Sequence, residues 1–269
     1  MIEILRRSAR RVLGWDSPAY ALLARAVAFS EVALSESIGT AIRISHLKRA
    51  SGAGRETLRL KRLVHPIEVR RGSSDLPTVV NTVVRQEYGR GWAGRSPRRI
   101  IDGGAYIGDT SAYFLSRFPG CEIVALEPDA DNFTVARANL APFGAQVELR
   151  RNALDGRART VRIAGRQLGA AISDDGDGEA VEAVTVPDIM CERGWTELDL
   201  LKMDIEGAEA SVLDEDADTW LPSVRRVILE PHGAAIEEAV RRTMLRNGFE
   251  VVRYRSLLYC DNLRAGVAS

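Results

Sequence analysis

The sequence has no long apolar run, few cysteines and no export signal. No stretch approaches the roughly 18 apolar residues that a membrane-spanning helix requires, so we expect no transmembrane segment. The first residues, MIEILRRSARRVLGW, are basic but lack the apolar core and cleavage site of a signal peptide. Cys121, Cys191 and Cys260 lie far apart without a C-x-x-C pair, which argues against a zinc site and for a reducing compartment. These absences predict a cytoplasmic protein.

The composition is that of an ordinary globular chain with an uneven charge. Its 269 residues are 45% hydrophobic and 28% charged, enough for one large α/β domain with an appendage. Residues 1–100 hold 19 Lys and Arg against 8 Asp and Glu, whereas residues 101–269 hold 18 against 29. The basic part could steer an anionic substrate, lie on an acidic membrane surface or form a solvated face, and we favour the last. Nucleic acid is not expected, because the basic residues are dispersed and no binding motif accompanies them.

Residues 98–128 contain the most informative pattern. Two short apolar runs, at 100–101 and 123–126, flank a glycine-rich turn and a helix-length segment. Short apolar runs are typical of strands that are buried on both faces of a parallel sheet. The segment between them, 110–118, has apolar residues at helical spacing and is followed by a Pro-Gly pair. The pattern predicts a βαβ unit.

The turn of this unit has the residues of a nucleoside-binding site. Gly103 and Gly104 have no Cβ, so the backbone can bend sharply and approach a ligand, and Gly108 lets the helix pack closely on the strand. Asp102 ends the first strand. Glu127 ends the second, about 20 residues on, where an acid can accept hydrogen bonds from both ribose hydroxyls. The unit therefore predicts a cofactor that contains a nucleoside.

The glycine spacing distinguishes between two cofactors. A dinucleotide requires G-x-G-x-x-G, and the glycines at 103, 104 and 108 do not match that pattern. Asp102 and Asp109 would repel a pyrophosphate, but acids suit the amino group and the sulfonium of S-adenosylmethionine. We therefore favour S-adenosylmethionine over NAD. A turn that binds nothing is the third alternative.

At these residues the sequence resembles the FkbM-type S-adenosylmethionine-dependent methyltransferases. Three stretches carry the resemblance: IIDGGAYIGDTS at 100–111, VALEPDADNF at 124–133 and LDLLKMDIEGAEASVL at 198–213. HPIEVRRGSSD at 65–75 and VILEPHG at 227–233 agree more weakly. The resemblance implies O-methylation of a hydroxyl on a sugar or polyketide-like secondary metabolite. Where the family often has Asn, this chain has Tyr106, whose side chain is expected to stack or pack.

The expected cofactor site extends beyond the turn. Asn152 and Ala153 end a strand predicted over 147–154 and should lie near the adenine, although Asn152 could equally be a plain turn former. The full set of expected cofactor-binding residues is Asp102, Gly103, Gly104, Ala105, Tyr106, Gly108, Asp109, Thr110, Glu127, Pro128, Asn132, Asn152 and Ala153.

The predicted fold is α/β, with a helical N-terminal region at 1–64 and a methyltransferase domain at 65–269. The domain is expected to have the mostly parallel, Rossmann-like sheet of a class I methyltransferase, with seven core strands and an antiparallel closing hairpin. Residues 155–186 predict an insertion of two or three strands at the edge of that sheet. The N-terminal helices could pack on the domain, cover the substrate or form a homodimer.

A helix is expected to run from the turn at 73–75 to about Tyr88. Its inner face would carry valines such as Val79 and Val83, and Glu87 would face water. Lys202 is expected to lie inside a strand rather than to act in catalysis.

Acids and one histidine follow the later predicted strands. Asp204 and Glu206 follow the strand at 198–203, and Glu230 and His232 follow the strand at 224–229. In an open α/β sheet, ligands bind at the carboxyl ends of the strands, where these side chains should meet Asp102 and Glu127. Methyl transfer to a hydroxyl requires close positioning and removal of a proton. The expected catalytic residues are His232, Asp204, Glu206 and Glu230. His232 is the preferred base because its ordinary pKa is near 6.5. Asp204 or Glu206 could act as the base if burial raised its pKa, or could instead orient the substrate. A histidine that only caps the turn is the alternative.

Three further interpretations stay open. Asp204, Glu206, Glu230 and His232 could bind magnesium or manganese, and chelators would then abolish activity, but the resemblance implies no metal and we expect none. An NAD(P)-dependent oxidoreductase is the alternative enzyme. A degenerate cofactor-binding module that acts through its basic helices is the alternative outside enzymes.

Overall fold

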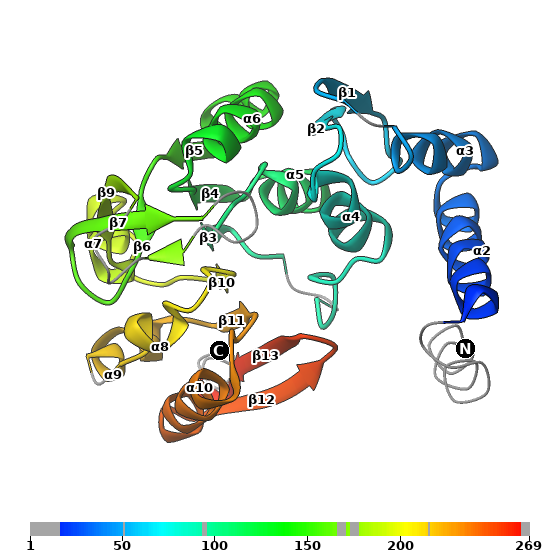
Figure 1. Ribbon diagram of the computed structural model, residues 1–269. Coiled ribbons are helices and arrows are strands. Elements are labelled where there is room, and N and C mark those ends of the chain that lie inside the picture. The colour runs from blue at the N-terminus through cyan, green and yellow to red at the C-terminus, as the bar shows by residue number, and fades with distance from the viewer. Residues whose placement is uncertain are drawn as a thin grey trace.

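A seven-stranded sheet forms the centre of the structure, a computed structural model (Figure 1) that describes residues 17–50, 52–92, 96–165, 171–172, 178–214 and 216–264. The strand order is β12-β13-β11-β10-β3-β4-β5. The parallel strands are β3 (Arg99–Gly103), β4 (Glu122–Leu126), β5 (Val147–Arg150), β10 (Leu200–Met203) and β11 (Arg226–Leu229). The antiparallel hairpin of β12 (Phe249–Tyr254) and β13 (Leu257–Asn262) closes one edge. The predicted class I topology is confirmed.

Alternate residues of the parallel strands enter two different hydrophobic cores. Ile100 and Ile123 belong to one core, whereas their neighbours Ile101 and Val124 belong to the other. Because successive side chains of a strand point to opposite faces, both faces of the sheet must be covered. This explains why the predicted strands read as continuous apolar runs.

Helices cover the two faces. The first core contains residues of α4 (Asp75–Val79), the π-helix η1 (Val80–Val84), α5 (Asp109–Arg117) and α6 (Ala130–Leu140). The second contains residues of α7 (Val186–Glu192), α8 (Glu209–Val212), α9 (Ala217–Trp220) and α10 (Ala234–Arg246). Two short 3₁₀ turns, η2 (Ala141–Gln146) and η4 (Leu221–Ser223), lead into strands. The helical segment expected to reach Tyr88 ends at Val84, with its valines buried as predicted.

The N-terminal region contains a strand that was not expected. Helices α2 (Pro18–Ser35) and α3 (Ile38–Leu47) agree with the prediction, but β1 (Arg55–Leu58) pairs antiparallel with β2 (Ile67–Arg70). Leu58 and Ile67 are register partners and both are buried, so apolar packing overrides the weak strand signal. None of the helices in the described ranges combines the length and apolar character needed to cross a membrane. Residues 1–16 of the expected helical N-terminal region lie outside the described residues.

The insertion forms its own sheet. Strands β6 (Ala153–Leu154), β7 (Arg159–Ala164), β8 (Ala171–Ile172) and β9 (Glu179–Val184) pair in the order β6-β9-β7-β8. The predicted extension of the main sheet is therefore wrong. Val161, Ile163 and Val181 bury their side chains in a small separate core, so this sheet has a reason to form independently. Its first strand, β6, comes from the second half of the strand predicted over 147–154.

Candidate active site

The glycine turn after β3 packs between two neighbouring loops. Gly104 has a φ of +73°, and a Cβ at this position would lie 1.9 Å from the carbonyl oxygen of Asp204. The N–H groups of Gly104 and Ala105 donate to the carbonyl of Leu126 at 3.0 and 2.8 Å. Glycine is required here because any side chain would collide with the loop that follows β10.

Glu127 lies at the end of β4 and holds the turn in place. Its Oε2 accepts a hydrogen bond from the N–H of Tyr106 at 2.7 Å, and its Oε1 accepts from Asp129 N at 3.0 Å and from Asn132 Nδ2 at 3.3 Å. Burial raises the pKa of the Glu127 carboxyl to about 7, although the hydrogen bonds from these amides favour its ionised form. The predicted acid is thus a buried, hydrogen-bonded group on the wall of the pocket described next.

A pocket that is partly open to solvent lies at the carboxyl ends of β3, β4 and β10. Glu127, Asp204 and Glu206 are among its lining residues. The remaining lining residues come from the turn, the β4 end and the inserted sheet: Gly104, Tyr106, Pro128, Ala153, Leu154, Ile163, Ile172 and Ile205. The pocket thus combines apolar side chains with Glu127, an acid of the kind that binds ribose hydroxyls, and with Asp204 and Glu206.

Tyr106 is anchored by its hydroxyl. The residue has a left-handed φ of +52°, and its hydroxyl donates to Asp75 Oδ1 at 2.6 Å. Asp75 is fully buried and also accepts from the guanidinium of Arg70 at 2.8 and 2.9 Å. Burial opposes the charge of Asp75, but these hydrogen bonds outweigh it and lower its pKa. The aromatic side chain is therefore packed and hydrogen-bonded, in agreement with the expectation that it packs.

Asp102 faces a lysine. Its Oδ1 lies 3.1 Å from Lys202 Nζ, and its Oδ2 accepts a hydrogen bond from the Ser111 hydroxyl at 2.7 Å. Both members of the ion pair are buried. Burial opposes the charge of Lys202, but Asp102 and Asp204 raise its pKa above the ordinary value. Lys202 lies in β10 as expected, and Asp102 supports the turn without lining the pocket.

The other expected cofactor residues divide into two groups. Gly104, Tyr106, Glu127, Pro128 and Ala153 line the pocket. Asp102, Gly103, Ala105, Gly108, Asp109, Thr110, Asn132 and Asn152 do not belong to its lining. Asn152 donates its amide to the carbonyl of Glu182 at 2.9 Å, which is a structural role. Burial raises the pKa of Asp109, at the start of α5, to about 6.

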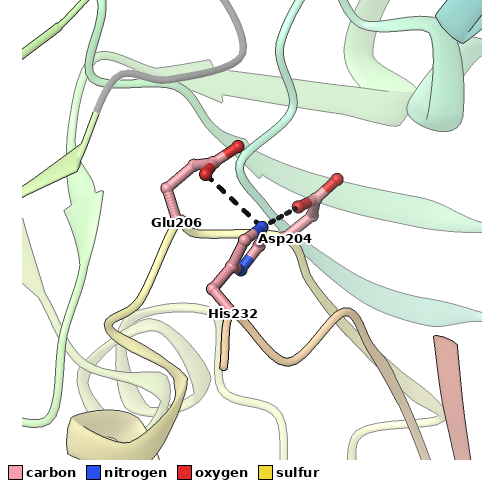
Figure 2. A group of neighbouring side chains, drawn as sticks. All are labelled: Asp204, Glu206 and His232. Atoms are coloured by element: carbon pink, nitrogen blue, oxygen red, sulfur yellow. Dashed lines mark ion pairs between the residues drawn. The ribbon is translucent and has the colours of Figure 1, made fainter. Parts of the chain in front are cut away.

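Three of the four expected catalytic residues form one group, shown in Figure 2. His232 Nε2 lies 3.6 Å from Asp204 Oδ1 and 3.4 Å from Glu206 Oε2. Asp204 and Glu206 follow β10, and His232 follows β11, so two parallel neighbouring strands bring them together. The fourth, Glu230, is half-buried, and burial and the charge of Asp204 raise its pKa.

Glu209, the residue that orients His232, was not among the expected site residues. Glu209 is fully buried, and its Oε1 lies 2.7 Å from His232 Nδ1. Its carboxylate also accepts the N–H groups of Ile205 at 3.3 Å and Gly207 at 3.1 Å. The hydrogen bond with Glu209 raises the pKa of His232 to about 9, which moves it away from the ordinary value that made it the preferred base. Glu209 is the last acid of the K-M-D-I-E-G-A-E run, so the signal was present in the sequence.

Glu87 does not face water as predicted. Helical structure ends at Val84 and Gln86 has a left-handed φ of +51°, so the outer helical face assigned to Glu87 does not exist. Burial raises the pKa of Glu87 to about 7, and the nearby charges of Asp109 and Glu230 contribute. Glu87 therefore adds a further acid beside the carboxyl ends of the strands.

The sequence is similar to those of known methyltransferases. A family model described as the methyltransferase FkbM domain matches residues 102–251, more than half of the chain. Methyltransferase sdnD of Sordaria araneosa is 28% identical over an alignment of 196 residues that covers 58% of this chain and 75% of that protein. The 31-O-demethyl-FK506 methyltransferase FkbM of Streptomyces tacrolimicus is 38% identical over 95 residues, 34% of this chain and 35% of that protein.

Solved structures show weaker similarity. The precorrin-6y C5,15-methyltransferase of Geobacter metallireducens GS-15 has a TM-score of 0.37 and 14% identity, with 61% of this chain and 77% of that chain covered. The METTL16 MTase domain has a TM-score of 0.43 and 15% identity, with 83% and 78% covered.

Proposed function

The chain belongs to the FkbM methyltransferase family, and from this premise we propose that it transfers a methyl group from S-adenosylmethionine to a hydroxyl of a sugar or polyketide-like secondary metabolite. The observation that carries the proposal is the pocket, in which Glu127 and the acids of the His232 group line the same space. A donor and an acceptor must meet within one such space, because the transfer is an in-line displacement that depends on close positioning.

The residues of the pocket fit the chemistry of S-adenosylmethionine. The Glu127 carboxylate is positioned for ribose hydroxyls, and Leu154, Ile163 and Ile172 provide apolar surface for an adenine. When bound, S-adenosylmethionine supplies a methyl group made electrophilic by the positive charge on sulfur.

The acceptor is expected beside Asp204, Glu206 and His232. These side chains are about one-quarter to one-third exposed, so an acceptor can reach them from solvent. Their polar atoms can orient a hydroxyl and take up its proton, which a hydroxyl acceptor must lose. The name of the Streptomyces tacrolimicus relative describes methylation of an oxygen of FK506, which supports a hydroxyl acceptor, although this chain spans only about a third of that relative. Family membership does not favour an oxidoreductase.

Calorimetric titration tests the cofactor. We expect micromolar binding of S-adenosylmethionine and none of NAD or NADP. Glu127→Gln should weaken donor binding at least tenfold, because a neutral amide removes the charge that ribose hydroxyls recognise. Glu122→Gln is the matched control, since Glu122 lies at the other end of the same strand and is exposed. Binding of NAD alone would refute the proposal.

A second experiment tests the acceptor. The protein is incubated with deuteriomethyl-labelled S-adenosylmethionine and a panel of glycosides, polyketide alcohols and matched amines, and products are identified by mass spectrometry. We expect a labelled methyl ether. Labelled amines alone would overturn the hydroxyl assignment, and donor binding without transfer to any acceptor would favour the cofactor-binding module.

A further inference from the structure

Asp204, Glu206 and His232 converge on one point at the edge of the pocket. Figure 2 shows the imidazole Nε2 between the two carboxylates. One ligand atom from each residue lies within 4.8 Å of the other two. In the described part of the chain, no other set of three or more His, Cys, Asp or Glu residues brings its ligand atoms this close.

The separations within the group are longer than hydrogen bonds. Nε2 lies 3.4 and 3.6 Å from the two carboxylate oxygens, whereas a normal N–H···O bond spans about 2.7–3.2 Å. Atoms that bind the same cation at about 2.1–2.3 Å are about 3.0–3.3 Å apart as neighbours in octahedral geometry and about 3.4–3.8 Å apart in tetrahedral geometry. The spacing of the three side chains therefore matches neighbouring ligands of a shared ion better than it matches direct hydrogen bonds.

The histidine is oriented by a residue outside the group. Glu209 is fully buried, contacts Nδ1 at 2.7 Å and is itself held by the backbone N–H groups of Ile205 and Gly207. With Nδ1 engaged, Nε2 is the ring nitrogen left to bind at the pocket. Histidines that bind metals commonly have their other ring nitrogen paired with a carboxylate in this way. The contact with Glu209 is thus a second feature of a cation site, separate from the distances among the three side chains.

We propose that Asp204, Glu206 and His232 bind one divalent cation at the acceptor end of the pocket. Two carboxylates and one imidazole suit a divalent ion that accepts both oxygen and nitrogen ligands, such as manganese or zinc, and the separations of 3.4 and 3.6 Å are those of a four-coordinate site. Three protein ligands then leave one position for water or for the acceptor. Asp204 and Glu206 line the pocket, so the open position would face the acceptor.

The use of the cation rests on the proposed function. A divalent cation beside an acceptor hydroxyl lowers the pKa of that hydroxyl and orients it toward the donor. This role does not require His232 to act as the base. The existence of the cation site, in contrast, can be measured without any acceptor.

The test is Mn²⁺ binding by the full chain after removal of metals with a chelator, followed by calorimetry and by electron paramagnetic resonance. We expect one site, and we expect Asp204→Asn and Glu206→Gln each to weaken Mn²⁺ binding at least tenfold. Asp218→Asn and Glu238→Gln are matched controls on exposed helix surfaces and should bind as the unsubstituted protein does. Mg²⁺ and Zn²⁺ are titrated in parallel, and circular dichroism confirms that each variant folds.

The outcomes separate this inference from the proposed function. Absence of Mn²⁺, Mg²⁺ and Zn²⁺ binding, or equal binding by the two site variants, overturns the cation site. If S-adenosylmethionine still binds in that case, the methyltransferase proposal stands. If a cation binds at this site but S-adenosylmethionine does not, the cation site stands and the proposed function fails.

Discussion

Lys202 is the residue whose replacement should disturb the structure of the site most. Its Nζ lies 3.1 Å from Asp102 Oδ1 and donates to the carbonyls of Gly104 at 2.7 Å and Gly103 at 3.3 Å. Lys202 and Asp102 are 2% and 0% exposed, so water cannot replace these contacts. Lys202→Met retains a side chain of similar length but removes the charge and every donor.

The expected loss of stability in Lys202→Met comes from the unpaired charge of Asp102. Removing one partner of a buried ion pair leaves the other unpaired, which costs about 3–5 kcal/mol. Total stabilities of domains are about 5–15 kcal/mol, so this loss is a large fraction of the whole. For a chain of this length, Tm falls by about 2 °C for each kcal/mol of stability lost, so we expect the Tm of Lys202→Met to fall by about 6–10 °C. The exposed Lys61→Met is the matched control and should change stability by less than about 0.5 kcal/mol.

Urea unfolding followed by circular dichroism measures this effect. Adding Asp102→Asn to Lys202→Met removes the unpaired charge, so the double variant should be more stable than the sum of the single losses, by about 1–3 kcal/mol. A loss below about 1 kcal/mol for Lys202→Met, or strictly additive losses, would refute the account of a buried ion pair that supports the turn.

Three further predictions concern the walls of the pocket. Burial raises the pKa of Glu127 to about 7, and only the ionised form suits ribose hydroxyls, so donor affinity should fall as the pH drops below about 7. Calorimetry should find that donor affinity depends less on pH in Glu127→Gln. Gly104→Ala should cost more than about 1 kcal/mol in urea unfolding, and more than Gly120→Ala, since both have a positive φ but only Gly104 meets the Asp204 carbonyl. Tyr106→Phe removes the donor to buried Asp75 and should cost about 1–3 kcal/mol in the same assay.

The central sheet was predictable because its signals are local and strong. The runs at 100–101 and 123–126 are apolar on both faces, and the structure places their alternate residues in two cores. The inserted sheet was less predictable, since alternation in β7 and β9 shows that one face is buried but not which partner buries it. The pairing of β1 was hard to predict for the same reason, because it depends on the packing of buried Leu58 with its register partner Ile67.

The candidate site was predictable where it depends on strand order and less so where it depends on side-chain direction. Asp204, Glu206 and His232 meet because parallel strands end at one edge of the sheet. Asp102 occupies such an end but turns toward Lys202, and no sequence pattern specifies that choice. Glu209 illustrates the same limit, because its one-turn helix starts only after Ala208 and places the carboxylate beside Nδ1 of the histidine.

The turn after β3 and the loop after β10 act as one structural unit, with consequences for binding. Gly104 packs on the Asp204 carbonyl, and Lys202, two residues before Asp204, donates to the carbonyls of Gly103 and Gly104. A change at Lys202 should therefore weaken donor binding and cation binding together. Glu127→Gln should weaken donor binding alone, because glutamine keeps the size of the side chain and the hydrogen bonds of Glu127 described above do not reach Asp204, Glu206 or His232. Parallel titrations of S-adenosylmethionine and Mn²⁺ on these two variants distinguish a shared support from two independent sites, since independent sites would leave cation binding in Lys202→Met unchanged.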